Sequence, residues 1–230
     1  MIDVDLRAYA QTNWIRHKKK VSIISKSHHT GTPLVQDDTI IYCFDDICDG
    51  LFDEKRKPTS VDGIIVTEKY IEMVEFKSGF KQRITKQNFD QEQGRCRHSN
   101  EVCKDYWDLF FKNQKSNISA LISSMRAKAV ESYVTLEKHI FPCCNQSDVH
   151  VPLKLLVVID DDGIDSMEDT LADLAGISDI SNNSFSSIRQ ALQRVKNCSD
   201  VNGKSYFYDA VEVMSARDFK NYLQLNSQKQ

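Results

Sequence analysis

The run VPLKLLVVI, at residues 151–159, constrains the fold of this chain more than any other feature. Its apolar residues occupy both alternating sets of positions, which predicts a strand that is covered on both faces. Helical patterns precede and follow the run, and helices are the elements that cover both faces of a sheet in α/β proteins. The chain is therefore expected to be an α/β protein with a central mixed sheet flanked by helices.

Helical periodicity is clearest at residues 118–140, directly before that strand. Apolar residues recur at intervals of three and four positions, and Pro142 closes the segment. A similar pattern predicts a helix of about 13 residues from Asp38, with a strand over Thr39 to Phe44 as the main alternative. The apolar positions of the longer helix are Ile118, Leu121, Ile122, Met125, Ala129, Tyr133, Leu136 and Ile140.

The remaining predicted elements lie at the two ends of the chain. A short strand is expected at Val21 to Ile24. After the central strand, the pattern predicts two helices, one strand and a last helix. Their ranges are 165–175, 184–196, 206–214 and 216–225.

Two apolar runs within residues 61–77, VDGIIVTEKYIEMVEFK, predict a β-hairpin. A two-residue loop at Glu68 and Lys69 pairs Val66 with Ile71 and fixes the register of both strands. Glu-Lys is a poor sequence for such a tight turn, which favours Gly or Asn. A slip of one residue would turn every side chain to the other face.

This register brings two carboxylates and an ammonium group to one face of the hairpin. Asp62 falls directly across from Glu75, and Lys77 shares their face. Two like charges opposite each other repel, and burial strengthens the repulsion, so they need a compensating cation. Lys77 supplies one positive charge, and a divalent ion held by both carboxylates would supply more, since Mg²⁺ prefers oxygen ligands. The alternative is that Glu75 and Lys77 form a surface ion pair at a strand end.

The hairpin resembles the PD-(D/E)xK nuclease superfamily. The resemblance consists of Asp62 followed, after twelve residues, by Glu75-Phe76-Lys77-Ser78-Gly79. It implies a restriction-endonuclease-like αβββαβ core over residues 38–160. Val61 stands where the name of the motif has proline, and no first core strand is evident before Asp62.

The resemblance also implies a chemistry. It implies that Asp62 and Glu75 bind Mg²⁺, or Mn²⁺ in its place, and that Lys77 orients or activates the attacking water. Relatives often add an acid from the first helix, and Asp45 and Asp49 are the candidates in this sequence. The implied activity is hydrolysis of phosphodiester bonds, in DNA rather than RNA.

A basic stretch follows the hairpin in the sequence. Residues 77–104 hold seven Lys and Arg against three Asp and Glu, with Phe80 and Phe89 among them. Such a local excess is typical of a surface that binds nucleic-acid phosphates. The alternative is a solvated basic loop. The residues expected to contact nucleic acid are Lys81, Arg83, Lys86, Arg95 and Arg97.

Composition adds a few bounds on location and domain count. The net charge of −3 gives no general attraction to nucleic acid, and no apolar run is long enough to span a membrane. The first residues lack the pattern of a secretory signal, and seven cysteines without a regular framework suit reduced thiols, so a cytoplasmic protein is expected. One domain is expected, with an N-terminal segment (1–37), the nuclease core (38–160) and a C-terminal α/β extension (161–230).

The resemblance suggests a biological setting as well. A small nuclease of this kind fits restriction or antiviral defence, and a homodimer would supply two sites for cutting both strands of a duplex. The first alternative is a repair or recombination nuclease that recognises DNA structure. The second is a catalytically silent binding subunit that keeps the fold. Residues 161–230 could also bind a regulatory protein.

Overall fold

Six strands form one mixed sheet within the residues that the computed structural model describes, namely 4–27, 31–78, 120–160, 188, 192 and 207–227. The strands are β1 (Lys18–Lys20), β2 (Ile40–Cys43), β3 (Gly63–Val66), β4 (Ile71–Lys77), β5 (Leu153–Ile159) and β6 (Ala210–Ser215). Their order in the sheet is their order in the chain. Neighbours from β1 to β4 are antiparallel, whereas β5 is parallel to both β4 and β6. The expected α/β class and mixed sheet are confirmed.

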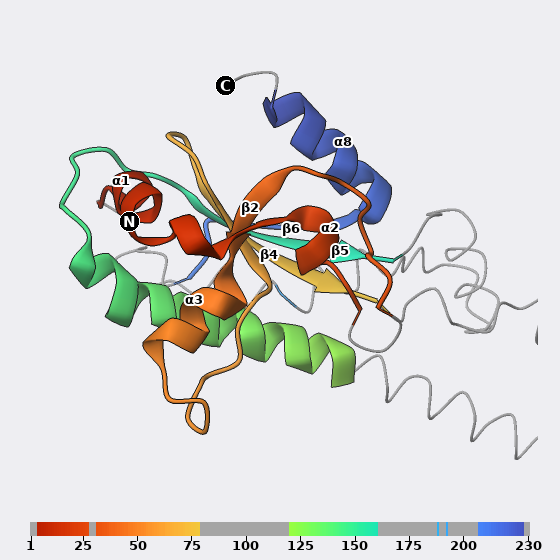
Figure 1. Cartoon of the computed structure of the whole chain (residues 1–230), viewed down its shortest axis with the longest axis horizontal. Coiled ribbons are helices and arrows are strands. Elements are labelled where there is room, and N and C mark those ends of the chain that lie inside the picture. The colour runs from red at the N-terminus through yellow and green to blue at the C-terminus, as the bar shows by residue number, and fades with distance from the viewer. Residues whose placement is uncertain are drawn as a thin grey trace, which may run out of the picture.

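Helices lie on both faces of this sheet. They are α1 (Leu6–Asn13), α2 (Val21–Ile24), α3 (Phe44–Leu51) and α8 (Ala216–Ser227), with a 3₁₀ turn, η1 (Ile15–His17), after α1. Residues 120–135 are α-helical and continue into a π-helical turn, η2 (Leu136–Ile140), and a 3₁₀ turn, η3 (Phe141–Cys143). We call residues 120–140 the long helix. Figure 1 shows the long helix (green) and α8 (blue) on opposite sides of the sheet.

Each face of the sheet has its own apolar core. On the long-helix face, Met125 and Ala129 pack with Met73 and Leu155, together with residues of α1 and α3. On the α8 face, the core residues come from the sheet, α2, α8 and the segment before β2, and they include Val74, Phe76, Leu156, Val158, Phe219 and Leu223. Every residue of β5 except Lys154 is buried, which confirms the prediction of a strand covered on both faces.

The structure corrects the expected N-terminal elements. The predicted helix from Asp38 is wrong over Ile40–Cys43, which form β2, and α3 begins only at Phe44. Both conformations suit the local apolar spacing, and pairing of β2 with β1 and β3 decides between them. The expected strand at Val21–Ile24 is helix α2, and the three lysines before it form β1.

The C-terminal elements agree more closely with expectation. The strand expected at 206–214 is β6, at Ala210–Ser215, and the last helix continues to Ser227. Ser215 caps this helix, because its hydroxyl accepts a hydrogen bond from the backbone N–H of Asp218 at 3.1 Å. The helices expected at 165–175 and 184–196 lie outside the described residues, apart from Ile188 and Leu192, which are helical and buried.

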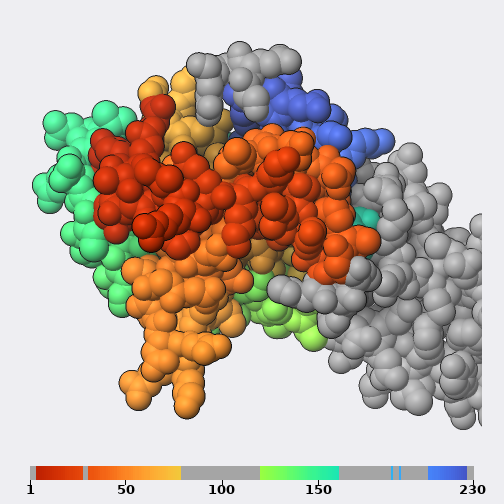
Figure 2. All heavy atoms as spheres, viewed as in Figure 1, coloured from red at the N-terminus to blue at the C-terminus, as the bar shows by residue number. Residues whose placement is uncertain are grey.

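The connection between α3 and β3 protrudes from the body of the molecule, as the space-filling view shows in orange (Figure 2). It leads directly into Asp62, so it brings this predicted site residue to the sheet. Among the described residues, no helix combines the length and apolar character needed to cross a membrane.

Candidate active site

The predicted hairpin register is confirmed. Val66 pairs with Ile71 and Gly63 pairs with Val74, so Asp62, which precedes Gly63, lies across from Glu75, which follows Val74. The two acids therefore lie side by side at the N-terminal end of β3. Glu68-Lys69 is an unfavourable sequence for a two-residue turn, but the register of β3 and β4 is the predicted one.

Thr67 explains why this turn holds its register. Its backbone N–H donates to the carbonyl oxygen of Tyr70 at 3.0 Å. Its hydroxyl oxygen accepts hydrogen bonds from the backbone N–H groups of Lys69 at 3.2 Å and Tyr70 at 3.1 Å. A side chain before the loop thus satisfies the backbone groups of the turn.

Both carboxylates are shielded from water. Glu75 is 1% exposed, and the side chain of Asp62 is 19% exposed. The backbone N–H of Phe76 donates to Asp62 Oδ2 at 2.7 Å, which fixes one oxygen of that carboxylate against β4. Burial of Glu75 shows that the alternative of a surface ion pair between Glu75 and Lys77 is wrong.

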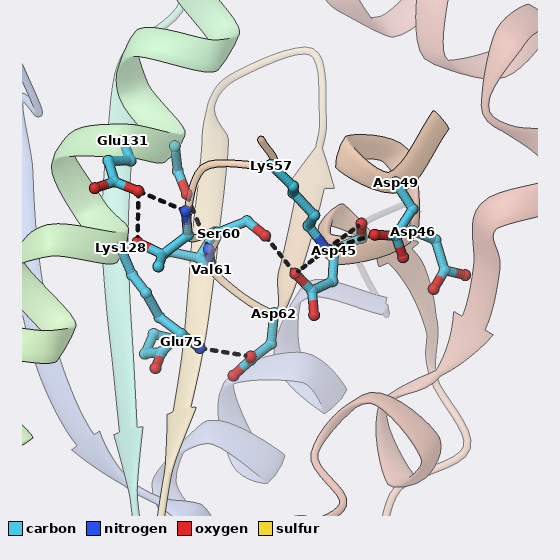
Figure 3. A network of polar contacts seen from close by, with 12 residues as sticks. Asp45, Asp46, Asp49, Lys57, Ser60, Val61, Asp62, Glu75, Lys128 and Glu131 are labelled. Atoms are coloured by element: carbon cyan, nitrogen blue, oxygen red, sulfur yellow. Dashed lines mark hydrogen bonds and ion pairs between the residues drawn. The ribbon is translucent and has the colours of Figure 1, made fainter. Parts of the chain in front are cut away.

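The cation between these acids is Lys128 of the long helix. Its Nζ lies 3.1 Å from Asp62 Oδ1 and 2.9 Å from Glu75 Oε2, and Figure 3 shows its side chain reaching toward both acids. Lys128 was not among the site residues predicted from the sequence. A usable signal existed, because Lys128 lies next to Ala129 and three residues after Met125, at the border of the apolar stripe.

One ammonium group leaves the acid pair incompletely satisfied. Glu75 Oε1 is buried and has no hydrogen-bond partner among the described residues. Two carboxylates and one lysine carry a net charge of −1 when all three are ionised. A buried acceptor without a donor beside surplus negative charge fits a divalent cation, and Mg²⁺ binds proteins through one or two carboxylates while keeping several waters. Within the described part of the chain, no cluster of three or more His, Cys, Asp or Glu side chains has the geometry of a metal site.

Burial dominates the protonation of these groups. Burial, followed by the negative charge of Asp62, raises the pKa of Glu75 to about 8. Burial also raises the pKa of Asp62, although Lys128 and the N–H of Phe76 oppose it. Burial lowers the pKa of Lys128, but the charges of Glu75 and Asp62 outweigh that effect and raise it above its usual range. Lys128 is therefore a permanent cation at this site.

The raised pKa of Glu75 predicts a pH dependence of stability. Its contribution to folding is fully present below the unfolded-state pKa of 4.5 and is lost as pH rises through about 8. In the Glu75→Gln variant the side chain cannot ionise. The free energy of unfolding of the wild type, relative to that variant, should therefore fall by about 4 kcal/mol between about pH 5 and pH 8.5. Urea unfolding at a series of pH values measures this difference, and a pH-independent difference would contradict the assignment.

The two acids proposed from the first helix differ in their placement. Lys57 Nζ binds both of them, at 3.0 Å from Asp45 Oδ1 and 2.7 Å from Asp49 Oδ1. Ser60 also donates a hydrogen bond to Asp45. The charge of Asp45 contributes to the raised pKa of Asp62, after burial, and Figure 3 shows Asp45 nearer to Asp62 than Asp49 is.

Lys77 lies at the end of β4, on the same face as Glu75, and is partly buried. Its positive charge lowers the pKa of Glu75, after the larger effects of burial, Asp62 and Lys128. The structure thus places Lys77 within electrostatic reach of the acid pair, whereas Lys128 makes the direct contacts. The predicted phosphate-binding residues Lys81, Arg83, Lys86, Arg95 and Arg97 lie outside the described residues.

The long helix also positions the segment that precedes Asp62. The backbone N–H of Val61 donates to the buried hydroxyl of Ser132 at 2.9 Å. One residue earlier on the helix, the carboxylate of Glu131 accepts hydrogen bonds from the backbone N–H and the hydroxyl of Thr59. Lys128, Glu131 and Ser132 therefore form one helical face that fixes Asp62 against Glu75. Figure 3 shows Lys128 and Glu131 on this helix.

Comparison of the chain with models of known protein families, with curated proteins and with solved structures finds no match.

Proposed function

We propose that this protein is a Mg²⁺-dependent nuclease that hydrolyses phosphodiester bonds, with DNA as the expected substrate. The observation that carries the proposal is the convergence of Asp62 and Glu75 on one cation position. That position is marked by Lys128 Nζ, with one oxygen of each acid at 3.1 and 2.9 Å. Buried carboxylates that share a charged partner and have perturbed pKa values are typical of functional sites.

The order of elements around the site supports the proposal. Antiparallel strands β2, β3 and β4 are followed in the described residues by the long helix and by β5, which is parallel to β4. The αβββαβ arrangement implied by the resemblance has this succession of three strands, a helix and a strand. In this chain α3 is inserted between β2 and β3. Fold alone does not assign an activity, so the site residues carry the argument.

Asp62 and Glu75 would hold the cation, and the charge of Asp45 also reaches Asp62. Mg²⁺, when bound, would polarise the phosphate and lower the pKa of a water molecule beside it. Lys77 extends from the end of β4 on the same face, where its ammonium group can orient water or offset charge that develops on phosphate oxygens. Hydrolysis consumes one water, breaks one P–O ester bond and leaves a proton on the departing oxygen.

The basic stretch, residues 77–104, begins in the sequence where β4 ends. It would bind the phosphates of the nucleic acid on either side of the cleaved bond.

The proposal is tested by incubating the protein with plasmid, linear double-stranded DNA, single-stranded DNA and RNA. Cleavage is expected with Mg²⁺ or Mn²⁺ and is expected to stop when EDTA is added. The panel also separates an endonuclease that nicks plasmid from a nuclease that needs ends or branches. If the folded protein cleaves none of these substrates with either metal, the proposal is contradicted.

Lys77→Ala should reduce the rate of cleavage by about 10²–10³-fold, because a positive charge beside the reacting phosphate is lost. DNA binding, measured by fluorescence anisotropy, should change little, since one ammonium group contributes only part of the phosphate contacts. Lys69→Ala, in the exposed turn of the same hairpin, serves as the control and should keep wild-type activity. Full activity of Lys77→Ala would remove Lys77 from the mechanism.

A second candidate function is a non-catalytic binding subunit. The observation in its favour is the Lys128 bridge, because an ammonium group that neutralises two buried acids serves a structural role without any metal. The two functions differ in metal binding, which the nuclease requires and the binding subunit does not. Restriction or antiviral defence, and a homodimer, follow from the resemblance alone and stay predictions.

A further inference from the structure

Lys128 and a divalent cation need the same carboxylate oxygens. Asp62 Oδ2 accepts a hydrogen bond from the backbone of β4, and its other oxygen, Oδ1, faces Lys128. On Glu75, Oε2 binds Lys128, whereas Oε1 has no partner among the described residues. The oxygen of Asp62 that the backbone does not hold is the one that contacts the ammonium group, so a cation that bridges the two acids would lie beside that group. Two cations at that distance repel each other.

We propose that Lys128 is a built-in competitor of the metal. It neutralises the acid pair in the metal-free protein, and it is displaced from both acids, still protonated, when a divalent cation binds. The inference rests on the proposed function and adds to it how the same site is regulated. The affinity for metal then equals the affinity of the bare acid pair reduced by the cost of displacing Lys128.

The geometry indicates that Lys128 moves rather than the acids. Glu75 lies within the central strand β4, between β3 and β5, and its side chain is 2% exposed. Lys128 reaches the site on a flexible four-carbon stem from the long helix, and its side chain is 23% exposed. The ammonium group therefore has a path to water that the Glu75 carboxylate lacks. After displacement it remains tethered beside the site, where a positive charge favours an anionic phosphate.

A second buried glutamate on β4 provides an internal comparison. Glu72 projects to the α8 face, accepts a hydrogen bond from the hydroxyl of Tyr222, and lies 3.7 Å from Lys154 Nζ. Lys154 and Lys128 have similar exposed fractions, 25% and 23%. Lys154 pairs with one carboxylate, that of Glu72, whereas Lys128 pairs with two. Lys154→Met is thus a matched control that removes a half-buried lysine without touching the proposed metal site.

The first experiment measures Mn²⁺ binding by calorimetry and by electron paramagnetic resonance at about pH 8.5, where protons compete least. Lys128→Met is expected to bind Mn²⁺ at least about tenfold more tightly than the wild type, because the competing cation is gone. Lys128→Arg keeps the charge and should bind no more tightly than the wild type. Lys154→Met should stay within about threefold of the wild type.

The second experiment needs no destabilising substitution. The side-chain ammonium resonance of Lys128 in wild-type protein, assigned through its loss in Lys128→Arg, is followed during titration with Mg²⁺. It should move to the position of a solvent-exposed lysine as the metal binds, while the resonance of Lys154 stays in place.

The outcomes separate the two proposals. Metal binding with an unmoved Lys128 resonance, or with no gain in affinity in a folded Lys128→Met, overturns the competitor inference and leaves the metal site standing. Absence of metal binding in the wild type and in every variant overturns the proposed function and this inference together.

Discussion

Glu75→Gln is expected to reduce metal-dependent cleavage by about 10²–10³-fold or more, while Glu72→Gln keeps activity within about threefold of the wild type. The two glutamates lie three residues apart on β4, and both are buried. They project to opposite faces of the sheet, so only Glu75 meets Asp62 and Lys128. The amide introduced by the substitution keeps the shape of the carboxylate but removes the charge that a divalent cation requires.

The paired design removes the most common ambiguity of such substitutions. Burial raises the pKa of Glu72 despite its hydrogen bond from Tyr222 and the charge of Lys154, so both wild-type side chains carry a desolvation cost. A general effect on the fold should therefore appear in both variants. Cleavage rates are measured with saturating Mg²⁺, and circular dichroism confirms folding. Equal losses in the two variants, or an active Glu75→Gln, would contradict the assignment of Glu75.

Lys128→Met is expected to lower the free energy of unfolding of the metal-free protein by about 3–5 kcal/mol. The substitution leaves two carboxylates facing each other in a site where Glu75 is almost fully buried. Lys57→Met is the matched control, because Lys57 also bridges two acids at 3.0 and 2.7 Å. Those acids, Asp45 and Asp49, have side chains that are 46% and 63% exposed, so the loss should be at most about 1 kcal/mol.

Metal should reverse much of the loss in Lys128→Met. A cation that binds only the folded state stabilises it in proportion to its affinity, so the melting temperature of Lys128→Met should rise more with Mn²⁺ than that of the wild type. Differential scanning calorimetry with and without Mn²⁺ measures both effects. A loss in Lys128→Met no larger than in Lys57→Met would show that burial of the acid pair does not set the energetics of the site.

The hairpin was predictable because its register follows from alternation alone. Once Val66 is paired with Ile71, the positions of Asp62 and Glu75 are determined by the period of two residues along a strand. The buried strand β5 and the long helix were predictable for a similar reason, since their apolar patterns fit one element type much better than the other.

The boundary between β2 and α3 was not predictable in the same way. The apolar residues from Ile40 to Leu51 fit helical spacing throughout, and nothing local marks Phe44 as the first helical residue. Pairing of Tyr42 with Ile64 and with Lys18 settles the conformation, and these partners lie about twenty residues away in either direction.

Lys128 was missed because a lysine at the edge of an amphipathic helix is most often a solvated residue. Its function depends on which face of the sheet the helix covers, and a helical pattern does not carry that information. The predicted need of Asp62 and Glu75 for a compensating cation is confirmed. The cation is Lys128, which lies 53 residues after Glu75 in the sequence, and not the neighbouring Lys77.

The most direct test of the account is the crystal structure of the protein grown with Mn²⁺, with anomalous scattering used to locate the metal. We expect an anomalous peak with oxygens of Asp62 and Glu75 about 2.1 Å away and with Lys128 turned out of contact with both acids. A structure at saturating Mn²⁺ in which Lys128 still bridges the two carboxylates, with no peak beside them, would contradict the central claim.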